Sequence, residues 1–148
     1  MTPTRFLKGF ILSFVLFTLL DAVWHAGLMA DFYNERLAVL NPGLGGAPGF
    51  SPFILFLEAV NAAAITYFVL RTASNNRPLA DGAMIGAILG FTVISSVNVL
   101  NHALIPGWDT TMVVVDTAWG TASGLVVGIG VAALCIPQKR GWFAWMHR

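Results

Sequence analysis

The sequence predicts an all-α membrane protein built as a four-transmembrane-helix bundle. Of its 148 residues, 57% are hydrophobic and only 10% are charged, which leaves too little charge to coat a soluble domain. Four apolar stretches approach the length of about 20 residues that a spanning helix needs. We therefore expect a single membrane domain over residues 1–148.

Proline, glycine and capping residues mark the ends of the predicted spans. Pro52 suits the first turn of the second span. Pro106 and Gly107 end the third. Asp109 can cap the start of the fourth, and Pro137 ends it. The first stretch follows basic residues, as a signal peptide would, but no convincing cleavage site follows it, so we expect a retained span. The four spans lie near residues 9–28, 53–70, 79–105 and 111–136.

Basic residues lie almost entirely on one side of the predicted bundle. Seven of the eight Lys and Arg residues precede the first span, lie between the second and third, or follow the fourth, and the opposite loops hold only Arg36. The positive-inside rule therefore places both termini in the cytoplasm. Trp142, Phe143 and Trp145 in the basic C-terminal tail are expected to anchor it at the cytoplasmic leaflet.

The loop after the first span has two parts. Apolar residues recur at helical spacing from Met29 to Leu40, with polar residues between them, which predicts an amphipathic helix on the outer membrane surface. Residues 41–52 then contain four glycines and three prolines, a composition that excludes regular structure. This segment is either a plain connector or a lid over a site.

The third and fourth spans each carry glycines at every fourth position. Such patterns put bare backbone along one helix face and allow close approach, within the chain or with another subunit. The series in the third span starts at the cytoplasmic end, whereas the series in the fourth span starts in the outer half of the membrane. We therefore expect only the inner parts of the two series to face each other. These glycines are Gly82, Gly86 and Gly90 in the third span and Gly120, Gly124 and Gly128 in the fourth.

Each predicted span also carries polar residues near its outer end. Counting about 1.5 Å of rise per residue places them in one layer roughly 5 to 10 Å below the outer surface. Within each helix they lie three or four residues apart and share a face. That face should point into the bundle, because polar groups facing lipid would be unsatisfied. This polar layer comprises Asp21, His25, Glu58, Asn61, Asn98, Asn101, His102 and Asp116, with Trp24 and Trp119 as its expected walls.

Several short motifs resemble those of a known family. They are Asp21-Ala22-Val23-Trp24, Phe32-Tyr33, the segment from Asn98 to Asn101 followed by Gly107-Trp108, and above all Val115-Asp116-Thr117-Ala118-Trp119-Gly120-Thr121. These motifs resemble the bacterial membrane proteins catalogued as domain of unknown function 2177, over nearly the whole chain. The resemblance implies a four-span, multi-pass protein of the bacterial inner membrane and supplies no established activity.

The resemblance also implies which positions form the centre of the motifs. These are Asp21, Trp24, Asn101, Asp116, Trp119 and Gly120. The chain departs from the family at two places: the family usually has Asp where Asn98 stands, and Thr where Leu100 stands. If that Asp transfers protons in the family, this chain has lost the role.

The polar layer marks a candidate site, because an ionisable group in hydrocarbon costs roughly 2.5 to 3.5 kcal/mol on insertion scales and usually has a functional reason. One interpretation is structural: hydrogen bonds, expected between Asp21 and His25 and between Asn101 and Asp116, fasten the helices. Another is binding of a lipophilic molecule that enters from the outer leaflet and presents its polar end to the layer.

Cofactor and catalytic alternatives use the histidines and carboxyls. His25 and His102 lie at similar depth on different spans and would suit a haem or chlorophyll-type pigment as axial ligands. A membrane enzyme would use Asp21 to orient His25 as general base, with Asp116 as the acid, on a lipid-like substrate. No recognisable catalytic motif favours a reaction class, so catalysis is the alternative to binding.

The expected partners follow from the same features. Membrane lipid is one, and a larger respiratory or photosynthetic complex is another, because a short chain with small loops suits an accessory subunit. A homo-oligomer through the glycine faces is a third. The net charge of +1 and the lack of a basic stripe argue against nucleic acid. The single cysteine, Cys135, excludes an internal disulfide, and no Cys/His cluster predicts a metal site.

Overall fold

The computed structural model describes residues 1–40 and 52–137, and the regular structure of these residues is entirely helical. The elements are α1 (Pro3–Val23), the π-helical turn η1 (Trp24–Leu28), α2 (Ala30–Leu40), α3 (Pro52–Thr72), α4 (Pro78–Leu104) and α5 (Thr110–Cys135). Four helical segments are long and apolar enough to cross a membrane, namely Pro3–Leu28, Pro52–Thr72, Pro78–Leu104 and Thr110–Cys135. The predicted all-α, four-span fold is confirmed. The predicted lid and aromatic tail lie outside the described residues, apart from Pro52 at the start of α3.

The helix ends follow the local chemistry of the chain. Thr2 caps α1 by accepting a hydrogen bond from the Arg5 amide at 3.3 Å. Asp109 caps α5 as predicted, with its Oδ1 accepting from the Thr111 amide at 2.8 Å. Between α4 and α5 the chain turns at Gly107, whose φ of 85° is a conformation that favours glycine. The two caps set where α1 and α5 begin, and the turn at Gly107 sets where α4 passes into α5.

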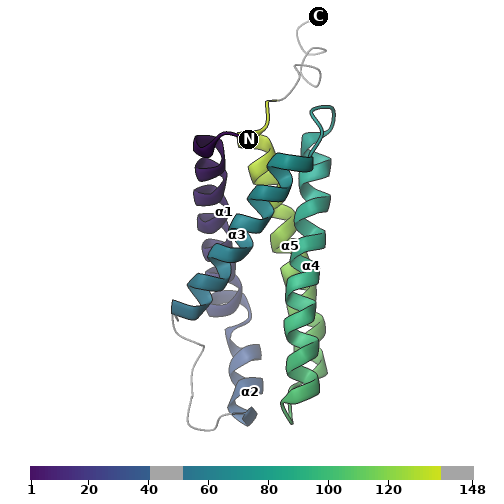
Figure 1. Ribbon diagram of the computed structural model, residues 1–148. Helices are drawn as coiled ribbons and strands as arrows, with labels where there is room; N and C mark the ends of the chain where they lie inside the picture. Colours follow the sequence, from purple (N-terminus) through teal and green to yellow (C-terminus); the bar gives the residue numbers. More distant parts are fainter. Residues whose placement is uncertain (41–51, 138–148) are drawn as a thin grey trace, which may run out of the picture.

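In the bundle, α1 and α4 run one way and α3 and α5 return, so the N-terminus and the end of α5 lie together (Figure 1). The helix predicted after the first span is present as α2. It follows the π-helical turn η1, closed by a hydrogen bond from the Met29 amide to the Trp24 carbonyl at 2.8 Å. Figure 1 shows α2 beyond the end of α1, continuing toward the far end of the bundle.

The glycines of α4 and α5 meet along both complete series. A methyl group built on Gly86 would overlap the carbonyl oxygen of Gly124, and one on Gly90 would overlap that of Gly120. Gly82 meets Gly128 in the same way. The prediction that only the inner parts face each other is therefore wrong. All six glycines are buried within this hairpin, so they pack two helices of the same chain together.

The hydrophobic core lies in the half of the bundle near the N-terminus. It contains Phe17, Ala62, Ile65, Val69, Val127, Val131, Ala132 and Ile136. In the same half a buried hydrogen bond of 2.9 Å joins the hydroxyls of Ser13 and Thr66. Close packing here contrasts with the opposite half, where the polar residues gather.

The Ser13–Thr66 hydrogen bond makes a direct test of helix fastening. We expect Thr66→Val to lower the free energy of unfolding by about 0.6 to 1.7 kcal/mol, the range measured for such bonds between membrane helices. The matched control is Thr92→Val, because the exposed Thr92 hydroxyl donates only to the Ile88 carbonyl of its own helix. Unfolding in mixed micelles measures both variants. Equal losses would contradict an interhelical role for Thr66.

Candidate functional site

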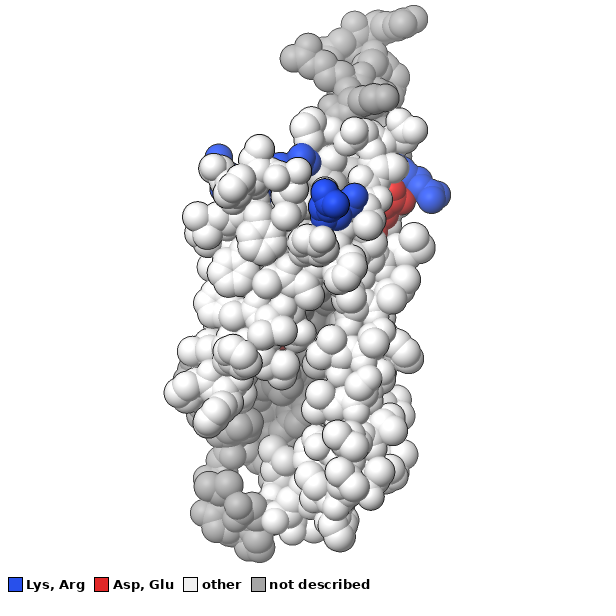
Figure 2. Space-filling model, in the orientation of Figure 1, with Lys and Arg blue, Asp and Glu red and all other residues white. Residues whose placement is uncertain are grey.

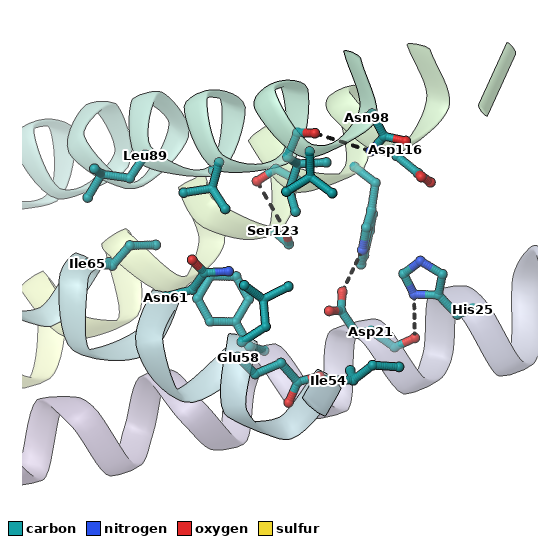
Figure 3. A pocket seen from close by; sticks show the side chains of 18 of the residues that line it. Asp21, His25, Ile54, Glu58, Asn61, Ile65, Leu89, Asn98, Asp116 and Ser123 are labelled. Carbon is teal, nitrogen blue, oxygen red and sulfur yellow. Dashed lines mark hydrogen bonds between the residues drawn. The ribbon is translucent and has the colours of Figure 1, made fainter. Parts of the chain in front are cut away.

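A cavity of about 280 Å³ opens between the spans in the half of the bundle away from the N-terminus, and residues of all four spans line it. Figure 2 shows that the surface of the bundle is hollowed between α3 and α4 in this half. The polar lining comprises Asp21, His25, Glu58, Asn61, Asn98, Asn101, Asp116 and Ser123. The apolar and aromatic lining includes Phe17, Ile54, Leu57, Ile65, Leu89, Val93, Ile94, Val97, Trp108 and Trp119. The cavity is thus amphipathic, and Figure 3 shows several of its polar side chains directed into one space.

Most of the predicted polar layer therefore converges on one cavity. The helical spacing that placed Asp21 with His25, and Glu58 with Asn61, on common faces accounts for this. Trp24 lies behind the lining, where it stacks on Trp119. Only His102 lies away from the layer: it is exposed, and its Nδ1 lies 2.9 Å from the Trp108 carbonyl oxygen.

Two stacked indoles organise one wall of the site. The rings of Trp24 and Trp119 have centroids 4.4 Å apart and lie nearly parallel, at 2°. Trp119 Nε1 donates to Asp21 Oδ1 at 2.7 Å, and Trp24 Nε1 donates to the Tyr33 hydroxyl at 3.1 Å. The stack holds both indole N–H groups in fixed directions, so it positions the Asp21 carboxyl and the Tyr33 phenol together.

Tyr33 of α2 completes this hydrogen-bond chain, and it was not among the predicted site residues. It is buried, and its hydroxyl donates to Asp116 Oδ1. Burial, followed by the hydrogen bond to Asp116, raises the pKa of Tyr33 well above its usual range, so the phenol remains protonated and a donor. The Phe32-Tyr33 motif was the feature of the sequence that could have identified Tyr33 as a site residue.

His25 does not have the partner that the catalytic interpretation requires. Its Nδ1 lies 3.1 Å from the backbone carbonyl oxygen of Asp21, not the carboxylate, and its ring packs 4.8 Å from that of Tyr33. The Asp21 carboxyl instead accepts from Trp119, and Asp116 accepts from Tyr33. The expected hydrogen bond between the side chains of Asp21 and His25 is therefore wrong. The hydrogen-bond partner of Asp116 is the Tyr33 hydroxyl, whereas Asn101 was expected in that role.

Glu58 of α3 and Asn98 of α4 also present polar groups to the cavity. The Thr18 hydroxyl donates to Glu58 Oε2 at 2.5 Å. Asn98 is 4% exposed, and its Nδ2 donates to the Ile94 carbonyl at 3.2 Å, whereas its Oδ1 is buried with no partner among the described residues. A buried oxygen without a donor costs about 1 to 3 kcal/mol, so this atom points to a missing hydrogen-bond partner.

The pigment interpretation loses its geometric basis. His25 lines the cavity, but His102 is exposed and outside it, so the two imidazoles do not face one space. Among residues 1–40 and 52–137, no group of three or more His, Cys, Asp or Glu side chains could hold a metal ion.

An ion pair at the far end of the bundle holds α2 against the start of α5. Arg36 Nε pairs with Asp109 Oδ2, and the Arg36 guanidinium also lies 3.8 Å from the centroid of the Phe32 ring. The backbone N–H of Thr111 and then the Arg36 side chain hold the pKa of Asp109 below its usual value. This pair helps to keep Tyr33 beside Asp116.

The lowered pKa of Asp109 predicts an acid-sensitive end of the bundle. Because the pKa is lower in the folded state, the stabilisation is present above the unfolded value of about 3.9 and is lost as the pH falls through the folded value. We expect hydrogen exchange in α2 to quicken over that range, beyond the intrinsic change in rate. In Asp109→Asn, which retains a capping side chain, this acid-dependent step should vanish. Its persistence in the variant would contradict the assignment.

Comparison with known proteins gives a family and no characterised relative. A family model described as a predicted membrane protein, domain of unknown function 2177, matches residues 6–133. No curated protein and no solved structure matches the chain. The match extends from the start of α1 almost to the end of α5 and includes every residue that lines the cavity.

Proposed function

Since the chain belongs to the family of predicted membrane proteins catalogued as domain of unknown function 2177, we propose that this member binds a lipophilic molecule within the bilayer. The polar end of the ligand occupies the cavity, and its apolar part leaves between α3 and α4. The observation that carries the proposal is an amphipathic cavity of about 280 Å³ between candidate membrane spans. This is slightly below the roughly 300 Å³ at which typical ligand pockets begin, as suits a cavity that holds only one end of a ligand.

Unused polar groups favour binding over simple fastening of helices. A purely structural network would pair its buried atoms within the protein. Here Asn98 Oδ1 has no partner among the described residues, and no hydrogen bond from a described residue reaches the side chain of Asn61, which also lines the cavity. A bound molecule supplies the partners that the described residues do not. Catalysis has weaker support, because His25 lacks a carboxylate partner.

We further propose that the protein lies in the bacterial inner membrane with both termini in the cytoplasm. The Lys and Arg side chains visible in Figure 2 lie at the end of the bundle that carries the N-terminus. At the opposite end, Arg36 is paired with Asp109. The positive-inside rule then assigns the first end to the cytoplasm and the cavity to the outer leaflet.

A pocket-filling variant tests the binding function. Ala64 lines the cavity, whereas Ala122 is exposed on the surface of α5. Ala64→Phe and Ala122→Phe therefore add the same side chain inside and outside the cavity. Native mass spectrometry of protein gently extracted from its own membrane should show a bound adduct in the wild type and in Ala122→Phe. The adduct should be lost in Ala64→Phe. An adduct equally present in both variants, or absent from the wild type, would contradict the proposal.

A further inference from the structure

We infer that the polar end of the ligand is a cationic hydrogen-bond donor, a protonated lipophilic amine. This inference rests on the proposed function, because it names the chemical class of the molecule that the cavity holds. It stands on two features of the lining: acceptor oxygens to which no described residue donates, and carboxyl groups with no Lys or Arg side chain of the described chain beside them.

Three residues of the lining offer acceptor oxygens to which no described residue donates. Asp21 accepts from Trp119 through Oδ1 and Glu58 accepts from Thr18 through Oε2, and no described residue donates to the second oxygen of either carboxyl. The buried Oδ1 of Asn98 likewise has no donor. An ammonium group carries three donors and no acceptor, so it can satisfy oxygens of this kind that face one space.

The charged groups of the lining have one predominant sign. Three carboxyls line the cavity, those of Asp21, Glu58 and Asp116, and no Lys or Arg of the described chain does. Burying acidic groups together is costly unless an opposite charge accompanies them. A ligand cation would supply that charge within the bilayer.

The remaining donors of the lining are compatible with an amine. Trp108 Nε1 is a buried donor without a partner among the described residues, and a hydroxyl beside the amine would accept from it. The imidazole of His25 and the amide of Asn61 can each act as donor or acceptor. Phe17, Ile65 and Leu89 give the lining an apolar part, which suits the carbons next to the amine.

A matched set of single-chain probes tests the class of ligand. Dodecylamine, dodecanol, dodecanoate and dodecyltrimethylammonium would be mixed at equal mole fraction into nanodiscs that hold the full chain. Native mass spectrometry then measures which probe remains bound. We expect dodecylamine to be retained about tenfold over each of the others, which corresponds to about 1.4 kcal/mol. The quaternary probe keeps the charge but lacks the N–H donors.

Variants separate the carboxyl contribution from a general effect of charge. Asp21→Asn retains an acceptor for Trp119, and we expect it to reduce the preference for dodecylamine over dodecanol by about tenfold. Glu58→Gln serves as a second variant should Asp21→Asn fail to fold. Asp31→Asn, which changes an exposed acidic residue of α2, should leave the preference unchanged.

The outcomes distinguish this inference from the proposed function. Equal or stronger retention of dodecanol, dodecanoate or the quaternary probe would overturn the amine assignment, and so would an unchanged preference in the folded carboxyl variants. In each case loss of binding in Ala64→Phe would still support a lipophilic-ligand site. If no probe is retained and the native adduct is also absent, the binding function itself fails.

Discussion

Gly124→Ala is expected to open the α4–α5 hairpin and to cause a large loss of stability. The added Cβ would overlap the carbonyl oxygen of Gly86 and lie 3.2 Å from the Gly90 Cα. Both are backbone atoms, which cannot rotate away as a side chain would. Overpacking costs about 1 to 3 kcal/mol where side chains can adjust, and we expect a value at or above the top of that range. Unfolding in mixed micelles measures the loss.

Gly27→Ala is the matched control for this experiment. A Cβ at Gly27 meets no atom within 4 Å outside its own neighbourhood, so the same chemical change adds no clash. We expect its unfolding free energy to stay the same or rise slightly, because alanine favours helical backbone over glycine by roughly 0.5 to 1 kcal/mol. Similar losses in Gly124→Ala and Gly27→Ala would contradict the close backbone contact between α4 and α5.

Tyr33→Phe is expected to break the link between α2 and the polar layer. The change leaves Trp24 Nε1 without its acceptor and Asp116 Oδ1 without its donor. Each buried group left unpaired costs about 1 to 3 kcal/mol. We therefore expect a marked loss of unfolding free energy together with faster hydrogen exchange in α2.

The chain provides its own control, because it contains two tyrosines. Tyr67 on α3 is 44% exposed and no hydrogen bond to its hydroxyl occurs among the described residues, so Tyr67→Phe should leave both measurements nearly unchanged. If Tyr33→Phe behaved like Tyr67→Phe, the Trp24–Tyr33–Asp116 chain would have no role in holding α2.

The sequence was sufficient to predict the span positions and the convergence of the polar layer. Both depend on local signals: prolines and Asp109 at helix ends, and spacings of three or four residues that put Asp21 with His25 on one face. These signals define the polar face of each helix, and the cost of polar groups in contact with lipid is what turns each face toward the bundle interior.

The hydrogen-bond partners could not be predicted because they depend on helix rotation and docking. Asp21 accepts from Trp119 instead of pairing with the side chain of His25, a choice set by the relative rotation of α1 and α5. Tyr33 was missed because a helix expected on the membrane surface would not bury its aromatic face against α5. The depth count for the glycines compared positions in single spans, whereas antiparallel register brings Gly90 to Gly120 and Gly82 to Gly128.

The most direct test of the central claim is photocrosslinking of a membrane-embedded lipophilic probe. A long-chain amine with a diazirine in its tail would be incorporated at low mole fraction into nanodiscs, irradiated, and mapped by peptide mass spectrometry. We predict labels concentrated on cavity-lining residues of α3 and α4, such as Ile54, Val93 and Val97, and their loss in Ala64→Phe. Labelling of the exposed α1 residues Leu7 and Ile11 to the same extent, unchanged in that variant, would show only general lipid contact and would contradict a binding site between the helices.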